Sequence, residues 1–396
     1  MASAFGVGLT IGMSQPLIAL HLEGRGYSSL TIGIVAGAYS AAILLFGPFV
    51  PAIVARMGTV RTLALGSVLA AGALIAFPFA PGLPLIILLR FVMGLGNACD
   101  WIISETWINT LPDEASRGRV VAIYATIWGA GTTGGPAILW LTGTAGSLPF
   151  LVGAALLAVA FQPVLAARRL APSIGRTTSS PHSVIRFLSA SPLPIATGIL
   201  CGFAEASVFS LFPIHATAHG MVAERAVLLA SAFALGNFAL QAPIGWLADR
   251  LSRRRLLGGI VIMALACLSI IPVGFGTAGL LWPTVILFGG AIAGLYTVGM
   301  VMLGQRHSAG DLAGASTAFI LAYTVGMIVG PVASGAAMAL WPEQGLLVAL
   351  ALVLAVFLVG ILVFGAPSGP RGRSRGDSGS KRQRKTEEAP GHAMGR

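Results

Sequence analysis

Charged residues are scarce in this sequence of 396 residues: they make up 9% of it, whereas hydrophobic residues make up 56%. Soluble globular proteins carry about 25% charged residues, so the composition excludes that class. The apolar character extends from Phe5 to Phe364, which also excludes a soluble domain on a single membrane anchor. Both lysines, Lys381 and Lys385, lie near the C-terminal end, so the apolar part of the chain contains none.

Cysteines and the signatures of enzymes and metal sites are also few or absent. Cys99, Cys201 and Cys267 lie far apart within apolar segments, where we interpret them as small buried residues and not as a disulfide framework. The sequence has no CxxC, HExxH or Walker-type GxxxxGKS/T pattern and no nucleophile–base constellation. We therefore expect no metal, no cofactor, no enzymatic activity and no ATP-driven transport by this chain alone.

Long apolar runs are what the sequence has instead. A transmembrane helix needs about 20 mostly apolar residues, and breaks at charge clusters, glycine and proline divide the chain into such runs. The predicted spans are residues 4–22, 28–50, 60–80, 84–109, 117–141, 146–167, 193–217, 226–248, 256–276, 280–304, 312–338 and 344–365. The fold class is therefore an all-α membrane protein with twelve transmembrane helices.

The arginines lie in every second connection between these spans. One set of connections holds Arg56, Arg61, Arg117, Arg119, Arg168, Arg169, Arg176, Arg186, Arg250, Arg253, Arg254, Arg255 and Arg306. The other set holds only Arg25 and Arg225. Because positive residues stay on the cytoplasmic side, both termini are predicted to be cytoplasmic. The formal charge of +11 is thereby explained by membrane topology, and we expect no nucleic-acid binding.

Two polar segments divide the chain. Residues 168–192 are rich in Ser, Pro and Arg and form a predicted cytoplasmic linker. It separates two six-helix bundles, at residues 1–167 and 193–366. Residues 367–396 are polar and basic, which predicts a disordered cytoplasmic tail that meets the lipid surface.

The two halves resemble each other. Residues 51–58 and 245–252 follow equivalent spans at a constant offset of 194. A GxxxGP pattern occurs once in each half, as Gly131, Gly135 and Pro136 and as Gly326, Gly330 and Pro331. GxxxG allows close helix contact and proline adds a kink, so such helices can rock or bend. Two homologous six-helix halves, with a substrate site between them near the midplane, are a known layout of transporters.

Three motifs carry a resemblance to the major facilitator superfamily over roughly residues 4–366. The loop pattern GxxxD(R/K)xG(R/K)(R/K) is met by Gly245, Asp249, Arg250, Arg253 and Arg254, with Ser252 in place of its second glycine. In the first-half copy Arg56 and Gly58 remain, and Ala55 stands where the aspartate should be. Arg90, Gly94 and Gly96 meet the pattern RxxxGxG, with Met93 in place of the usual glutamine.

The third motif is similar to the GxxxGP motif of proton-coupled antiporters. It is met by Gly131, Gly135 and Pro136, and Leu139 and Trp140 replace the glycines that often follow. The stretches at 104–107, 117–124 and 321–331 look like a poorly characterised bacterial branch. We expect a monomer in a bacterial inner membrane, whose partners are lipid, protons and a small-molecule substrate.

Away from the span ends that border the arginine-rich connections, four charged residues lie inside predicted spans: Arg90, Asp100, Glu105 and Glu205. Charge inside a bilayer is costly and usually marks function. Glu205 is near the middle of its span, and burial favours the protonated form of a carboxyl group. It is predicted to carry a proton or to meet a cationic substrate group. A structural hydrogen bond to a neighbouring helix is the alternative.

Arg90 is near the outer end of the fourth span. The counterpart of Arg90 in the family is linked to proton movement. Since a guanidinium does not lose its proton, Arg90 would act on a neighbouring carboxylate or bind an anion; snorkelling to the surface is the alternative. Asn97 and Asp100 follow on the same helix face and could line a cavity. Asp100 is a second candidate proton site, and Asn97 is favoured as a link between helices.

Glu105 is near the cytoplasmic end of the same span. The resemblance implies a gate in which Glu105 pairs with Arg56 or Arg117. Asp249 and Arg250 would serve the second half in the same way, beside Arg253 and Arg254. The predicted function is proton-coupled export of a small organic molecule. Proton symport of a sugar or organic acid, and a non-transporting membrane sensor or scaffold with a filled cavity, are the alternatives.

Overall fold

The computed structural model describes residues 1–110, 114–166, 187, 191–306 and 309–363. All regular structure in this part of the chain is helical, as predicted. Nearly all of the predicted linker 168–192 and the whole predicted tail 367–396 lie outside the described residues. The linker and tail assignments therefore stay predictions.

The first half is built from six long helices. These are α1 (Ala2–Gly24), α2 (Ser29–Phe46), α4 (Thr59–Ala76), α5 (Leu83–Thr110), α6 (Glu114–Thr142) and α7 (Leu148–Ala166). The short elements η1 (Gly47–Phe49) and α3 (Val50–Met57) extend α2, and η2 (Phe77–Phe79) extends α4. The extension ends at Gly58, whose φ of 85° is a conformation that favours glycine.

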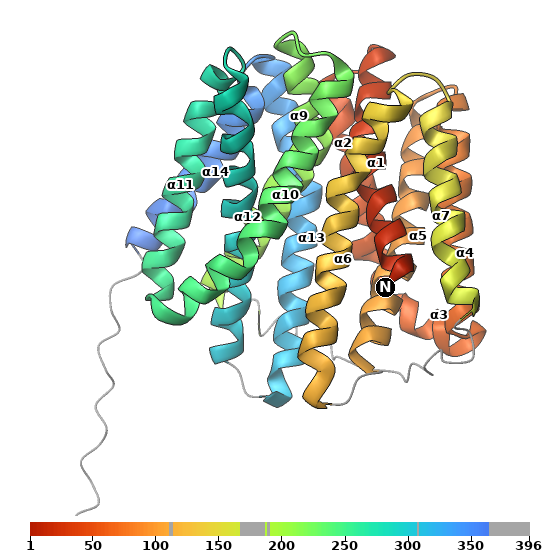
Figure 1. The fold of residues 1–396 in the computed structure, drawn as a ribbon, viewed down its shortest axis with the longest axis horizontal. Helices are drawn as coiled ribbons and strands as arrows, with labels where there is room; N and C mark the ends of the chain where they lie inside the picture. The colour runs from red at the N-terminus through yellow and green to blue at the C-terminus, as the bar shows by residue number, and fades with distance from the viewer. Residues whose placement is uncertain (111–113, 167–186, 188–190, 307–308, 364–396) are drawn as a thin grey trace, which may run out of the picture.

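The second half repeats this pattern. Its helices are α9 (Pro192–Ala218), α10 (Ala223–Arg250), α11 (Arg253–Gly274), α12 (Ala278–Arg306), α13 (Ala309–Leu340) and α14 (Gly345–Val363). Figure 1 shows α11 and α14 at one side of the molecule and α4, α5 and α7 at the other, with α1, α6, α10 and α13 between them. The most extensive contacts that join the halves are those of α2 with α13, α6 with α10 and α1 with α9.

Eleven helical segments of the described chain are long and apolar enough to cross a membrane. The remaining long helix is α6, which was predicted to span at 117–141. Its stretch from Gly129 to Gly135 consists of glycine, alanine and threonine, which lowers its apolar character. Because α6 packs against α1 and α10, small residues there serve helix contact and not lipid exposure.

The repeated glycines lie at equivalent contacts in the two halves. A Cβ atom at Gly135 in α6 would lie 2.4 Å from the carbonyl oxygen of Leu9 in α1. A Cβ at Gly330 in α13 would lie 2.4 Å from the carbonyl oxygen of Phe203 in α9. Gly131 and Gly326 make the same kind of contact one turn earlier in each helix. The pair α1 and α6 in the first half and the pair α9 and α13 in the second half are thus in equivalent direct backbone contact, and Pro136 and Pro331 follow that contact.

Candidate functional site

A cavity of about 330 Å³ lies between the two halves. Helices α1, α2, α5 and α6 line it from the first half, and α9, α10 and α13 line it from the second half. Most of its wall is aromatic or aliphatic. The aromatic side chains are Tyr39, Trp101, Tyr124, Trp128, Phe209, Phe238 and Tyr323.

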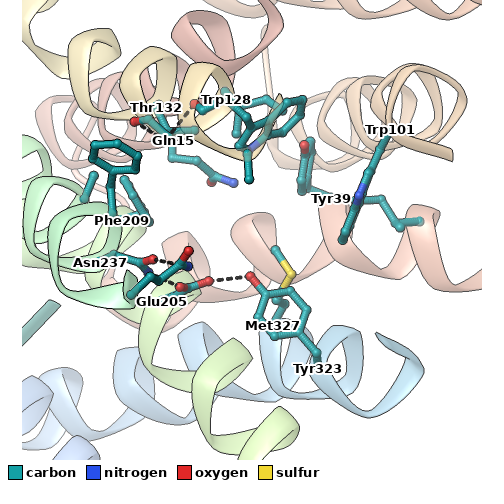
Figure 2. A pocket seen from close by; sticks show the side chains of 18 of the residues that line it. Gln15, Tyr39, Trp101, Trp128, Thr132, Glu205, Phe209, Asn237, Tyr323 and Met327 are labelled. Atoms are coloured by element: carbon teal, nitrogen blue, oxygen red, sulfur yellow. Dashed lines mark hydrogen bonds between the residues drawn. The ribbon is translucent and has the colours of Figure 1, made fainter. Parts of the chain in front are cut away.

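Glu205 in α9 is the one carboxylate among the described residues that line the cavity, and no Lys, Arg or His lines it there. Its Oε1 accepts a hydrogen bond from Nδ2 of Asn237 in α10. Its Oε2 accepts one from the hydroxyl of Tyr323 in α13. Figure 2 shows this cluster on one side of the opening, with Gln15 and Trp128 on the other. The carboxylate thus accepts from neutral donors on two other helices and lines the cavity.

Arg90 in α5 lies in a sealed position beside the cavity, with 1% of its surface exposed. Its Nη2 donates to Oε1 of Gln15 in α1. Its guanidinium carbon lies 4.6 Å from the ring centre of Tyr39 in α2. The Gln15 oxygen also accepts from Ser210 Oγ in α9 at 3.4 Å, which ties this cluster to the second half. Since the guanidinium is covered by its own half, it does not snorkel to the surface.

Asn97 and Asp100 point to different neighbours. Asn97 Nδ2 donates to the hydroxyl of Tyr39 at 3.0 Å, so Arg90 and Asn97 share this tyrosine. Asp100 instead lies against α4, where Ser67 Oγ is 3.5 Å from its Oδ1. Both side chains are buried. Of the four residues predicted for the proton and substrate site, only Glu205 lines the cavity.

The predicted gate residues lie at the helix ends next to the arginine-rich connections. Arg56, Glu105, Asp249 and Arg250 are exposed. The guanidinium carbon of Arg250 lies 3.8 Å from the ring centre of Trp246, one turn earlier in α10. This contact joins Arg250 to its own helix.

Two further arginines of the loop motif are partly buried at the start of α11. Arg254 donates to the carbonyl oxygens of Ile361 and Leu362 at the end of α14. Arg253 is half-buried. The side chain of Arg117 lies outside the described residues. Arg254 therefore docks α11 on α14, and the gate stays a prediction.

At the opposite helix ends, the halves are in close contact. The hydroxyl of Thr217 in α9 donates to the carboxylate of Glu23 in α1, at 3.3 Å from each oxygen. A Cβ at Gly33 in α2 would lie 2.1 Å from the carbonyl oxygen of Pro331 in α13. These contacts join the two halves on the side of the connection between α1 and α2.

Several residues of the site were not found from the sequence. Gln15, Asn237 and Gln241 are amides inside apolar spans, and all three line the cavity. Polar residues at membrane depth are a usable signal, although a weaker one than charge. Tyr39 and Tyr323 gave no signal, because tyrosine is common in membrane helices and only the packing brings these two to Arg90 and Glu205.

Sequence comparison places the chain among known membrane transporters. The family model described as Major Facilitator Superfamily matches residues 1–281 and again residues 195–391. A Bacillus subtilis (strain 168) protein named "Uncharacterized MFS-type transporter YfkF" is 26% identical over 365 residues, which are 91% of this chain and 93% of that protein. A Salmonella newport (strain SL254) protein named "Uncharacterized MFS-type transporter YcaD" is 25% identical over 363 residues, which are 89% of this chain and 92% of that protein.

Solved structures share the fold. The crystal structure of the nucleoside transporter NupG superposes with a TM-score of 0.72 at 16% identity, covering 92% of this chain and 96% of that one. A bacterial homolog of the human lysosomal transporter Spinster, in an inward-facing and occupied conformation, gives 0.69 at 16% identity and covers 92% and 95%. At this identity the likeness concerns the fold.

Proposed function

This chain belongs to the major facilitator superfamily, and on that premise we propose that it moves a small organic molecule by alternating access in exchange for protons. Membership of the family supports membrane transport as the function. The observation that carries the proton-coupled form is Glu205. Its carboxylate faces a cavity between the halves and is held by donors from two other helices.

Proton binding at Glu205 is coupled to helix packing by the hydrogen bonds of its carboxylate. An ionised carboxylate only accepts, and both Asn237 Nδ2 and the Tyr323 hydroxyl donate to it. A proton on either oxygen makes that oxygen a donor and a weaker acceptor, so the hydrogen bond that it accepts is weakened. The two donors lie on α10 and α13, which contact α6 and α2 of the other half. Protonation therefore changes the hydrogen bonds that link Glu205 to helices in contact with the other half.

The orientation follows from charge. With the arginine-rich connections in the cytoplasm, the side on which Thr217 and Glu23 join the halves is the outer side, and the contact there supports an inward-facing state. Export is supported by the antiporter-like pattern of Gly131, Gly135 and Pro136 in α6. We place the protein, as a monomer with cytoplasmic termini, in a bacterial inner membrane.

Transport in reconstituted vesicles tests this function. A ligand screen by thermal shift on the purified full-length protein identifies a substrate. We then expect a pH jump across proteoliposomes to drive movement of that substrate, and substrate addition to drive proton flux in the opposite direction. Protein-free vesicles and an uncoupler are the controls. Proton flux in the same direction as substrate would establish symport in place of exchange, and no flux of an established ligand would favour the sensor or scaffold.

The orientation has its own test. Cysteines introduced at Ser180 and Ser378, which lie outside the described residues, should resist an impermeant thiol reagent added to intact cells. The native cysteines Cys99, Cys201 and Cys267 are buried, so their background reaction should be low. Ready labelling of both introduced cysteines from outside would contradict the predicted orientation.

A further inference from the structure

The charge of the cavity wall limits what it can bind. Glu205 is its one carboxylate, and no basic side chain of the described chain lines it. The other polar groups, such as the amides of Gln15, Asn237 and Gln241, are neutral. Neutral donors stabilise an ionised carboxylate without cancelling its charge. The wall therefore carries one negative charge when Glu205 is ionised and none when it is protonated.

Arg90 does not line the cavity and so offers a ligand there no direct contact. Its guanidinium is covered by Gln15 and by the ring of Tyr39, and 1% of its surface is exposed. A substrate anion would have to displace both of these neighbours before it could reach Arg90. An anion in the cavity as it stands would meet Glu205 and no opposite charge. This arrangement disfavours anions and leaves room for a single positive charge.

The rest of the wall suits apolar and aromatic groups. Trp101 and Trp128 line the cavity from the first half, and Phe209 and Phe238 line it from the second half. Aromatic faces attract cations, most strongly those of tryptophan. The volume of about 330 Å³ is near the lower end of the range for small-molecule sites. The cavity thus offers one carboxylate within an aromatic enclosure of limited size.

We propose that the substrate is a monovalent organic cation, whose charge lies at Glu205 and whose apolar groups contact the aromatic side chains of both halves. This inference rests on the proposed function, because it makes the cation and the proton competitors for one carboxylate. Binding of the cation releases one proton, and binding of a proton releases the cation. The exchange of one for the other moves no net charge.

Two probe ions of the same shape and opposite charge test the charge class. Tetraphenylphosphonium and tetraphenylborate are titrated into the purified full-length protein in detergent, and quenching of tryptophan fluorescence and proton release into weak buffer are recorded. We expect the phosphonium to bind and to release protons, and the borate to do neither. This comparison uses the wild-type protein and needs no variant. Equal or tighter binding of the borate, or no binding of the phosphonium, would overturn the proposal.

Matched variants test the place of the charge. Glu205→Gln should weaken phosphonium binding by about tenfold or more, as expected for a lost interaction with a charged group, and should abolish proton release. Glu343→Gln removes an exposed carboxylate outside the cavity and should bind like wild type. Unchanged affinity in Glu205→Gln would overturn the proposal.

Binding and transport fail in different ways. Selective phosphonium binding without proton-coupled movement in vesicles would contradict the proposed function and leave the charge class standing. Proton-coupled movement of a neutral or anionic ligand would leave the function standing and contradict the charge class.

Discussion

Two charged side chains in the interior are held in parallel ways, one in each half. Arg90 contacts the amide of Gln15 and the ring of Tyr39, from α1 and α2. Glu205 contacts the amide of Asn237 and the hydroxyl of Tyr323, from α10 and α13. In both clusters, one helix supplies the charge and two others supply an amide and a tyrosine.

The clusters differ in access. Arg90 is sealed within the wall, whereas Glu205 lines the cavity. A charge that is sealed can set geometry and local potential, but it cannot exchange its ligand without a rearrangement of its neighbours. A charge that faces a cavity can exchange a proton or a substrate group. From this difference we propose that the arginine cluster supports the structure and that the glutamate cluster carries the chemistry.

Glu205→Gln tests the cavity-facing charge most directly. The amide mimics the protonated acid, so we expect proton-coupled transport to be abolished while the thermal midpoint in detergent changes little. Substrate exchange without a pH gradient is expected to need a higher substrate concentration, because loss of the Glu205 charge weakens binding of the cation. The measurement is proton flux on substrate addition in proteoliposomes, with Glu343→Gln as the control. If Glu205→Gln couples as well as wild type, the proton carrier lies elsewhere, with Asp100 the next candidate.

Arg90→Met tests the sealed side. It removes the donor to Gln15 and the stacking on Tyr39, and it leaves a buried amide oxygen with a weaker set of partners. The expected cost is about 1–3 kcal/mol of stability, seen as a lower thermal midpoint. Arg90→Lys should recover part of it. A variant with wild-type stability and no transport would show that Arg90 has a functional and not a structural role.

Removal of one tyrosine hydroxyl from each cluster tests whether the two clusters differ in function. Tyr323→Phe removes a donor to a charged acceptor, an interaction of about 1.5–3 kcal/mol, so proton-driven transport should fall by roughly tenfold. Tyr39→Phe keeps the ring over Arg90 and loses the acceptor of Asn97, at a cost of about 1 kcal/mol in stability. Initial rates and thermal midpoints of both variants are measured together. Equal loss of transport in both variants would contradict the proposed difference in role between the Arg90 and Glu205 clusters.

The smallest effect is expected at the exposed end of α10. Asp249→Asn should leave expression intact and slow alternation severalfold, if Asp249 stabilises one facing state by pairing with an arginine. Glu224→Gln, in the first turn of the same helix, is the matched control and should keep the wild-type rate. Transport assays at saturating substrate make the comparison. A wild-type rate in Asp249→Asn would contradict the gate.

Composition alone was sufficient for much of the architecture. Apolar runs of about 20 residues can only be membrane helices in a chain so poor in charge, and the observed helices follow the predicted spans closely. Glu205 was found because a carboxylate at membrane depth is too costly to be incidental. The paired glycines were found as a repeat, and their close helix contacts follow from the same pattern.

The residues that contact Arg90 and Glu205 are determined by the tertiary structure. The Tyr323 hydroxyl reaches Glu205 across 118 positions of sequence, and Gln15 joins Arg90 across 75. In a soluble helix the apolar face marks the side that is buried. In a membrane helix, lipid and protein interior are both apolar, so the sequence has no such mark. Only the packing of the helices therefore determines which side of α5 is sealed and which side of α9 faces the cavity.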